Sequence, residues 1–403
     1  MLGAITPTVR VLRMPAADET EVVLAPLAGP ALAEVVRAAW DAGEAIAPIN
    51  AQLSARERAA VVDLIRPTQI HDADGRRPLP GGAPTAADVV AMMTTSGTAG
   101  APKGVELTRA GMEVMGRGYS AGVHATASDN WLVCLPLHHV ASLGVLARSY
   151  VTGVPYTVHE QFDMERVAQS PRTEGTTIVS LVPTTLLRLL DAGAPLHEYR
   201  VLLIGGAPCP ASLRARAEAT GATVIDAYGL TETWSGCALD GRAISGADIR
   251  VDATTGEVLV KGAMVMRGYR FDPDRTAEVL EIDGTFHTGD IGVIDGGRLR
   301  VVDRLKDIVI TGAVNVSPTE VESVLLRHDA IDDVCVIGVQ DDEWGERVVA
   351  VVVSDRPPTL DELRAFAREE LSAAKLPKEV RVVAEIPRSN SGKPLRRVLR
   401  GEA

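Results

Sequence analysis

The chain has 403 residues, of which 46% are hydrophobic and only 3% aromatic, and its formal net charge is −12. This length is too great for one ordinary core, so we expect at least two folding units with aliphatic interiors. The negative charge argues against nucleic acid or an anionic membrane as a bulk partner, so anionic ligands would need local basic groups. We expect no secretory signal at the start and no membrane span, because no apolar run approaches about 18 residues.

The four cysteines are scattered along the chain. Their spacing fits neither a disulfide framework nor a zinc site, and free thiols are typical of a reducing compartment. We therefore expect unpaired cysteines and a cytoplasmic protein. The four are Cys134, Cys209, Cys237 and Cys335.

Two helices are predicted in the first 88 residues, over 30–42 and 54–65, because a proline or a capping residue opens each. Residues 88–93 are mostly apolar and predict a buried strand. The strand leads directly into a segment rich in glycine and hydroxyl groups.

That segment, residues 95–104, reads Thr-Ser-Gly-Thr-Ala-Gly-Ala-Pro-Lys-Gly. Glycines let backbone N–H groups turn toward an anion, hydroxyls add donors, and Lys103 adds a positive charge. The segment therefore predicts a phosphate-binding loop, the alternative being a flexible polar loop. It is not a Walker A loop, because Pro102 precedes the lysine and Gly104 follows it. The candidate ligands are Thr95, Ser96, Gly97, Thr98, Gly100 and Lys103.

Residues 131–140 follow a helix that Thr108 can cap, and they predict a buried strand ending in two histidines. Adjacent residues on a strand point to opposite faces, so His138 and His139 cannot chelate a metal together. A structural role and a place in a ligand pocket both stay open.

Strands and helices then alternate, which predicts parallel strands joined by crossover helices. Ligands of such sheets bind beyond the carboxyl ends of the strands, where the glycine-containing loops 205–208 and 228–233 fall. The strands are predicted over 177–181, 201–204 and 223–226, and the helices over 183–191 and 211–220.

From residue 248 the pattern changes to short alternating strands, with a hairpin turn at 295–297. Residues 307–403 read as a compact α+β domain. Its two helices open at Ser317 and Thr359 with capping-box patterns.

Six motifs, in this order, resemble the adenylate-forming superfamily, which includes acyl-CoA synthetases, firefly luciferase and the adenylation domains of peptide synthetases. Residues 95–104 match its phosphate loop except at Ala99, where a second Thr is common. The others are the L-P-L-F-H-like stretch 135–139, Y-G-x-T-E at 228–232, T-G-D at 288–290, the G-R-x-(K/D)-D-like segment 303–307, and P-x-(T/S)-x-x-G-K at 387–393.

The resemblance implies an α/β fold in two domains. Residues 1–303 would form a large N-terminal domain of stacked, mostly parallel sheets with helices and a small β-barrel-like unit. Residues 304–403 would form a small, mobile α+β lid, with its hinge at Lys306.

The resemblance also implies roles for individual residues. An aromatic face can stack on adenine, a hydroxyl can bond a phosphate oxygen, and a carboxylate can hold Mg²⁺. The implied catalytic residues are Lys393, Glu232, Thr231 and His139, with Glu232 as the magnesium ligand. Nucleotide binding would involve the loop residues above together with Gly206, Ala207, Pro208, Asp226, Tyr228, Gly229, Asp290 and Arg304. The acyl pocket would comprise His138, His139, Ser142, Trp234 and Cys237.

The implied activity is a two-step ligation in which ATP and Mg²⁺ convert a carboxylic acid to an acyl-adenylate, and coenzyme A then takes the acyl group. Within the superfamily, 135–142 and 228–241 look most like compact actinobacterial o-succinylbenzoate–CoA ligases. Residues 131–158 contain no acidic side chain to hold an amino acid's ammonium group. Three departures stand out, where Ser142 and Asp303 replace glycines and Ala313-Val314 replaces a glycine–glutamate pair.

Three alternatives stay open. The acyl group could pass to a carrier protein, the adenylate chemistry could serve another nucleophile, as in nitrite-dependent diazotisation, or the chain could be a non-catalytic nucleotide-binding relative. The sequence also leaves open the identity of the acid and the oligomeric state, a homodimer included.

Overall fold

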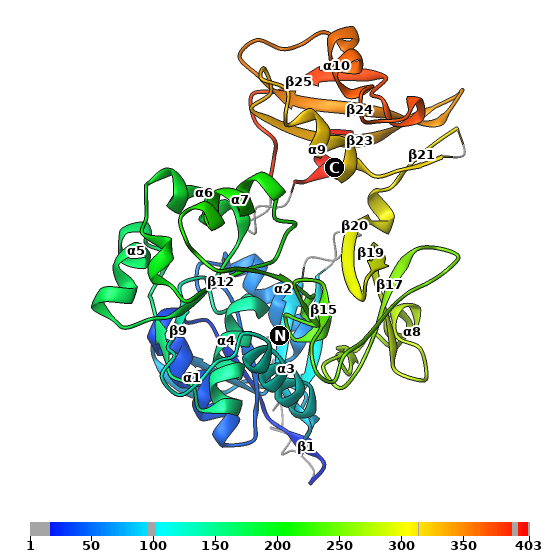
Figure 1. Ribbon diagram of the computed structural model, residues 1–403. Coiled ribbons are helices and arrows are strands. Elements are labelled where there is room, and N and C mark those ends of the chain that lie inside the picture. The colour runs from blue at the N-terminus through cyan, green and yellow to red at the C-terminus, as the bar shows by residue number, and fades with distance from the viewer. Residues whose placement is uncertain (1–16, 96–101, 313, 389–393, 402–403) are drawn as a thin grey trace, which may run out of the picture. The chain divides into compact units, whose positions relative to one another are not determined.

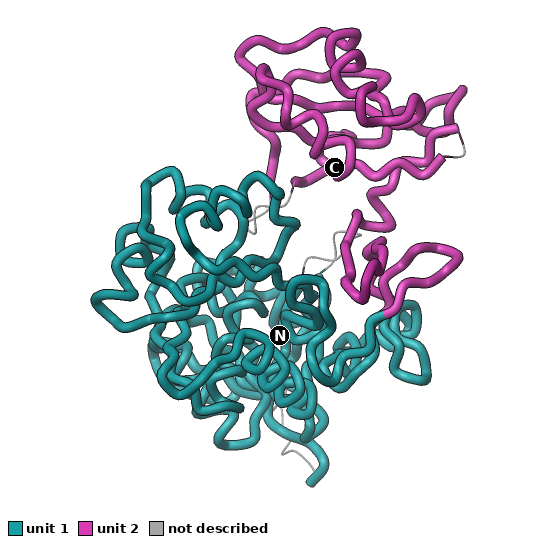
Figure 2. The backbone as a smooth tube through the Cα atoms, viewed as in Figure 1, with its two compact units in different colours: residues 1–249, 260–286 teal, residues 250–259, 287–403 magenta. Residues whose placement is uncertain are grey.

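The computed structural model describes residues 17–95, 102–312, 314–388 and 394–401 (Figure 1). The chain forms two compact units (Figure 2). Unit 1 comprises Met1–Ile249 and Val260–Phe286, and unit 2 comprises Arg250–Leu259 and His287–Ala403. The expected mixed α/β architecture with several sheets is confirmed, whereas the predicted boundary after residue 303 and the hinge at Lys306 stay predictions.

The first sheet of unit 1 carries both stems of the predicted phosphate loop. Two of its strands pair antiparallel, and their register places Thr95 opposite Lys103. In order across the sheet, the strands are β18 (Gly268–Tyr269), β8 (Lys103–Thr108), β7 (Val89–Thr95), β3 (Ala45–Pro48), β2 (Val22–Ala25), β4 (Gln69–Asp72) and β5 (Gly75–Pro78). A separate two-stranded sheet joins β1 (Glu19–Thr20) to β6 (Thr85–Ala86).

The second sheet of unit 1 contains the predicted parallel strands. Its central strands are apolar and buried, as expected where helices cover both faces. In order across the sheet, the strands are β10 (Tyr156–Val158), β9 (Trp131–Val133), β11 (Ile178–Leu181), β12 (Val201–Ile204), β13 (Val224–Tyr228), β14 (Ala238–Leu239) and β15 (Arg242–Ala243).

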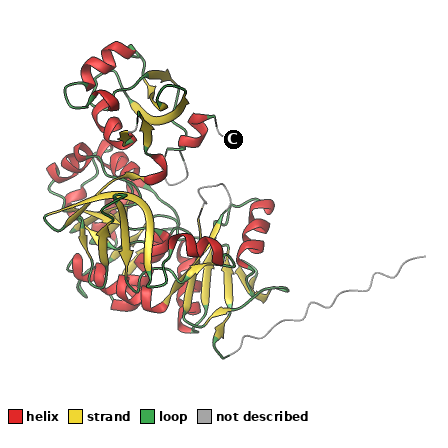
Figure 3. Ribbon diagram, turned by 90° about the vertical axis from the view of Figure 1, so that its right-hand side faces the viewer, coloured by secondary structure: helices red, strands yellow, loops and turns green. Residues whose placement is uncertain are grey.

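Helices and strands alternate in layers in unit 1 (Figure 3). The contacts place α1, α3 and α4 between these two sheets, because α3, on the first sheet, packs on α4, on the second. Helix α1 packs on β2, β3 and β10, α3 packs on β8, and α4 packs on β9 and β10. Ser54 and Thr108 cap α2 and α3 as predicted. The helices of unit 1 are α1 (Gly29–Asp41), α2 (Ala55–Ile65), α3 (Arg109–Gly122), α4 (Val140–Thr152), α5 (Met164–Thr173), α6 (Pro183–Asp191), α7 (Ala211–Ala219) and α8 (Pro273–Val279), with the 3₁₀ turns η1 (Leu196–Glu198) and η2 (Thr231–Thr233).

The predicted strand over 131–140 is wrong beyond Val133, where β9 ends. The chain turns at Pro136, which has no N–H for a strand ladder and whose carbonyl accepts a hydrogen bond from the His139 N–H at 3.0 Å. His139 then becomes the N-cap of α4. The two histidines therefore do not point to opposite faces, because their ring centroids lie 4.4 Å apart.

Unit 2 contains the predicted α+β domain, built on a five-stranded sheet with the order β22 (Val314–Val316), β21 (Val309–Thr311), β24 (Gly345–Val353) and β23 (Asp333–Asp341), and with β25 (Glu379–Val382) also paired to β24. Its helices are α9 (Pro318–Leu325), α10 (Leu360–Ala367) and α11 (Arg396–Arg400), with the turns η3 (Leu305–Asp307) and η4 (Ala373–Lys375). A four-stranded sheet runs β16 (Asp248–Val251), β17 (Glu257–Lys261), β19 (Thr285–Asp295) and β20 (Arg298–Arg304).

Local sequence signals account for several turns and caps of unit 2. Gly296 and Gly297 have φ of 54° and 72° in the predicted hairpin turn, a conformation that favours glycine. Thr359 forms the full predicted capping box with Glu362. The box predicted at Ser317 is only half formed, because the Glu320 carboxylate binds Lys375 at 2.6 Å instead. Over the described ranges, no helix is long and apolar enough to cross a membrane.

Candidate active site

The stems of the phosphate loop are held in register by the pairing of β7 with β8. Thr95 and Lys103 face each other at the ends of these strands, and both side chains are half-buried. The predicted ligands Ser96, Gly97, Thr98 and Gly100 lie outside the described residues. Their assignment stays a prediction.

Lys103 and Glu232 meet through one tyrosine that the sequence did not mark. The Lys103 Nζ donates to the Tyr269 hydroxyl at 3.3 Å, and this hydroxyl donates to Glu232 Oε1 at 2.9 Å. The ammonium also lies 4.4 Å from the centroid of the Tyr269 ring, a cation–π contact. Sheet register explains the meeting, because Tyr269 on β18 stands opposite Val105 on β8, and Lys103 lies two residues away on the same face.

Two hydrogen bonds fasten the segment that carries Glu232 to residues of unit 1 that are far from it in the sequence. Its carbonyl, in η2, accepts a hydrogen bond from the Met266 N–H at 2.7 Å. The Trp234 indole N–H donates to the Thr108 carbonyl at 3.0 Å. The segment that follows β13 is therefore fastened at Glu232 itself and at Trp234, two residues later.

Burial, and next the negative charge of Glu232, raise the pKa of Tyr269 well above its usual value. The hydroxyl therefore stays protonated at neutral pH and donates to the carboxylate. Among the described residues, Glu232 Oε2 has no hydrogen-bond partner. It is a carboxylate oxygen of the kind that Mg²⁺ prefers.

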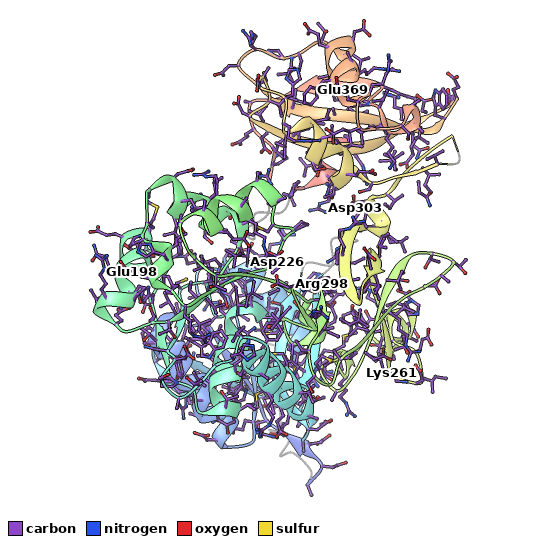
Figure 4. The ribbon with its side chains drawn as sticks, in the orientation of Figure 1. Glu198, Asp226, Lys261, Arg298, Asp303 and Glu369 are labelled. Atoms are coloured by element: carbon purple, nitrogen blue, oxygen red, sulfur yellow. The ribbon has the colours of Figure 1, made fainter. Side chains whose placement is uncertain are left out.

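Asp226 lies in the middle of β13 and is labelled in Figure 4. Arg214 donates to its Oδ2 at 2.6 Å and to Asp240 at 2.9 Å. Asp226 Oδ1 is buried without a partner among the described residues, which leaves an acceptor for an N–H group such as an adenine amine.

The two glycine-containing loops follow adjacent parallel strands, as predicted. Gly206 has a φ of 79°, in the left-handed region, directly after β12, and Ala207 and Pro208 continue that loop. Gly229 follows Tyr228 at the end of β13, and a Cβ there would lie 2.3 Å from the Gly236 Cα. Close backbone packing therefore requires glycine at 229.

The predicted acyl-pocket residues differ in exposure. His138 is half-buried, and burial, together with the charge of His139, lowers its pKa to about 4, so it is neutral at neutral pH. His139 is exposed at the start of α4, whereas Ser142, Trp234 and Cys237 are buried. Their shared role in one pocket stays a prediction.

A buried cation, Arg148 on α4, also escaped the sequence analysis. It is only 3% exposed, and its Nε and Nη1 have no hydrogen-bond partner among the described residues. Its guanidinium carbon lies 4.3 Å from the centroid of the Tyr119 ring and 5.3 Å from that of Trp131, and Nη2 donates weakly to Ser235 at 3.4 Å. Burial lowers the pKa of Arg148 to about 10. It is therefore charged at neutral pH, with no carboxylate of the described chain to pair with.

Unit 2 brings together two of the residues predicted to bind the nucleotide. Asp290 on β19 stands opposite Arg304 on β20, and their side chains form an ion pair at 2.5 Å. The preceding Gly289 donates its N–H to Glu257 Oε1 at 2.8 Å, which orients the Thr-Gly-Asp segment. Lys306 follows in η3, and Lys393 lies outside the described residues.

The structure thus groups the predicted residues within each unit. In unit 1 it links Lys103 to Glu232 through Tyr269 and pairs Thr95 with Lys103, and in unit 2 it pairs Asp290 with Arg304. No short motif marks Tyr269 or Arg148. Only the strand pairing and the helix packing reveal their contacts.

Comparison with protein families gives two matches. The family model described as AMP-binding enzyme matches residues 67–270, and the model described as AMP-binding enzyme C-terminal domain matches residues 320–393.

Known proteins agree with these matches. A 2-succinylbenzoate–CoA ligase of Bacillus cereus (strain Q1) is 34% identical over 337 residues, which cover 78% of this chain and 70% of that protein. The o-succinylbenzoate CoA synthetase (MenE) of Bacillus subtilis, solved with the acyl-adenylate OSB-AMP, has a TM-score of 0.84 at 28% identity and covers 95% of this chain and 88% of its own. ATP-bound MatB of Rhodopseudomonas palustris has a TM-score of 0.85 at 26% identity, with the same coverage of 95% and 88%.

Proposed function

Because the chain belongs to the AMP-binding enzyme family, we propose that it is an ATP-dependent carboxylic acid–CoA ligase whose acid is 2-succinylbenzoate. The acid's carboxylate attacks the α-phosphorus of ATP, which forms the acyl-adenylate and releases pyrophosphate. The thiol of coenzyme A then attacks the acyl carbonyl, and AMP leaves.

The first step joins two anions, so the site must place positive charge and N–H donors where negative charge develops. We assign Lys103 and the loop 95–104 to the phosphates, and Asp226 and Tyr228 to the adenine. Lys393, by its place in the family motif, would bring an ammonium to the reacting carboxylate.

One observation carries the assignment, namely the chain of hydrogen bonds from Lys103 through Tyr269 to Glu232. It joins the phosphate-loop cation to the Y-G-L-T-E carboxylate, two motifs that the sequence separates by more than 120 positions. A charged pair arranged in this way suits a Mg²⁺–triphosphate, whose phosphates need the cation and whose metal needs the carboxylate.

The residues present fit Mg²⁺ held mainly by substrate. The described residues contain no group of three or more His, Cys, Asp or Glu side chains arranged for a metal. Mg²⁺ usually takes one or two protein carboxylates, and substrate phosphates and water supply the rest. Glu232 would be the protein ligand, and the bound ion would neutralise phosphate charge.

The buried guanidinium of Arg148 supports an acid with a second carboxylate. A buried charge without a partner is costly, and a bound carboxylate would supply both the charge and the acceptors that Nε and Nη1 lack. Ser235, beside this guanidinium, lies between Trp234 and Cys237 of the proposed acyl pocket. 2-Succinylbenzoate keeps one free carboxylate after the other has reacted.

The proposal is tested by two assays on the full chain with a panel of carboxylic acids. ATP–pyrophosphate exchange reports acyl-adenylate formation, and thioester formation with coenzyme A reports the second step. We expect both with 2-succinylbenzoate, and we expect Lys393→Ala to slow exchange by about 10²–10³-fold.

The same panel separates the alternatives. Exchange without a CoA thioester, together with loading of a phosphopantetheinylated carrier protein, would favour a carrier as acceptor. Product formed only with another nucleophile, such as nitrite, would favour the diazotisation chemistry. No exchange with any acid would contradict ligase activity and favour a non-catalytic nucleotide-binding relative.

We also propose a cytoplasmic enzyme, since all four cysteines are free and three of them are buried. Sedimentation of the full chain measures the oligomeric state and distinguishes a monomer from a homodimer.

A further inference from the structure

We propose that Tyr269 is a positioning residue that holds the Lys103 ammonium and the Glu232 carboxylate one side chain apart, ready for a Mg²⁺-nucleotide. This inference rests on the proposed function for the identity of the ligand. It deepens that function by assigning a role to a residue outside the six motifs.

The two hydrogen bonds of the Tyr269 hydroxyl, here called the bridge, run in one direction from Lys103 to Glu232. Lys103 donates to the Tyr269 oxygen at 3.3 Å, and the hydroxyl proton is then directed to Glu232 Oε1 at 2.9 Å. A phenol can accept one hydrogen bond and donate another, so it serves both groups at once. A Phe at this position would keep the ring contact of 4.4 Å to Lys103 but would lose both hydrogen bonds.

Tyr269 is well placed for this task because its backbone is fixed. The residue is 6% exposed, and its backbone N–H donates to the Thr276 hydroxyl at 2.9 Å. The neighbouring Arg270 N–H donates to the Gly104 carbonyl at 2.7 Å, and the Met266 N–H donates to the Glu232 carbonyl at 2.7 Å. The same short segment is thus tied to the strand that carries Lys103 and to the turn that carries Glu232.

Electrostatics explains why a spacer is useful. An ammonium and a carboxylate in direct contact neutralise each other, and that ion pair would have to break before either group could serve the nucleotide. With the phenol between them, Lys103 keeps further N–H donors for phosphate and Glu232 keeps Oε2 for metal. We therefore expect Tyr269 to contribute to Mg²⁺-nucleotide affinity and not to affinity for the acid.

The test measures binding directly. Isothermal titration calorimetry of the full chain with a non-hydrolysable ATP analogue, at several Mg²⁺ concentrations and without acid, gives Kd and its Mg²⁺ dependence. We expect Tyr269→Phe to raise Kd about tenfold and to require more Mg²⁺ for half-saturation. Tyr269→Leu, which also removes the ring, should raise Kd further.

Two comparisons separate positioning from a general structural role. Tyr150→Phe removes a hydroxyl that binds Asp41 at 3.0 Å, away from these groups, and should leave Kd unchanged. In a Glu232→Gln background the Tyr269→Phe effect should shrink, because the bridge then lacks its charged acceptor. Thermal unfolding of each variant checks that it folds.

A Tyr269→Phe variant that folds, with wild-type Kd and Mg²⁺ dependence, overturns the proposal. So does a Tyr269→Phe effect that is fully additive with Glu232→Gln. If Tyr269→Phe does not fold, the same criteria apply to Tyr269→Leu. A wild-type chain that binds the Mg²⁺-nucleotide but forms no 2-succinylbenzoyl thioester contradicts the proposed function and leaves this test intact.

Discussion

Asp303 at the end of β20 caps helix α9 from outside the helix, because its Oδ2 accepts hydrogen bonds from the Ser317 hydroxyl at 2.7 Å and from the Thr319 N–H at 2.8 Å. The carboxylate is labelled in Figure 4, and the residue is 6% exposed. A negative charge at a helix N-terminus satisfies N–H groups that lack partners within the helix. Where the superfamily commonly has glycine, this chain thus has a side chain that joins β20 to the α+β domain.

Asp303→Ala should destabilise unit 2 by about 1–3 kcal/mol, because one buried and one half-buried donor lose their acceptor. Hydrogen–deuterium exchange at the start of α9 measures this locally, and thermal unfolding measures it globally. Asp355→Ala, at an exposed loop position, is the matched control. If the Thr319 amide of Asp303→Ala exchanged hydrogen for deuterium as slowly as in wild type, the capping role would be contradicted.

Lys306→Pro should spare adenylation and suppress thioester formation. Proline fixes φ and removes an N–H, so it would restrict the rotation that we propose at η3 between the two steps. Pyrophosphate exchange and CoA-thioester formation are measured side by side, with Lys306→Ala as the control that leaves the backbone free. An equal loss of both activities would refute the hinge.

Arg148→Met should lower kcat/KM for 2-succinylbenzoate by about 30- to 1000-fold, because a desolvated carboxylate loses its charged partner. Benzoate, which has no second carboxylate, should react slowly with wild type and variant alike. Arg216→Met, which removes an exposed ion pair with Asp191, is the control. Equal losses for both acids would show that Arg148 supports the fold and does not select the substrate.

Glu174→Gln should destabilise unit 1 in a pH-dependent way. Burial opposes ionisation, but hydrogen bonds from His159, Arg166 and Ser170 outweigh it and lower the pKa of Glu174 to about 2. The folded-state pKa lies below the unfolded value near 4.5, so the stabilisation is complete above about pH 4.5 and disappears as the pH falls toward 2.

By calorimetry, the free energy of unfolding of Glu174→Gln should therefore be about 1–3 kcal/mol lower than that of wild type at pH 7. This difference should become smaller in acid. The control is Glu165→Gln, an exposed residue of α5, the helix that ends just before Glu174. Its free energy of unfolding should equal that of wild type. A difference that does not change with pH would mean that the carboxylate charge is not what stabilises the fold.

The sequence predicted local structure well wherever a local signal existed. The helices opened by Ser54 and Thr108, the glycine turn at 296–297 and the apolar strand over 201–204 all depend on signals within a few residues. The strand over 131–140 failed because apolar content outweighed the turn signal of Pro136 in the prediction.

In the candidate site too, residues within local motifs were predicted, and residues placed only by tertiary contacts were missed. Motifs identified Lys103 and Glu232 because phosphate and metal chemistry restrict residue types over short windows. Tyr269 touches both only because β18 pairs with β8 across more than 160 positions, and no local pattern reports that register. Arg148, in the middle of a helix, has the sequence appearance of an ordinary solvent-facing cation, and only tertiary packing removes it from water.

Residues 260–286 belong to unit 1, although residues 250–259 before them belong to unit 2. This order limits where the chain can be cut to make a truncated protein or a chimera. A cut after Ile249 would remove β18, so β8 would become a bare sheet edge and Glu106 would lose the Arg270 guanidinium that lies 3.0 Å away. Such a fragment invites aggregation along the open strand. The junction of a chimera with a related protein should therefore lie after Phe286. The predicted domain boundary after residue 303 meets that condition.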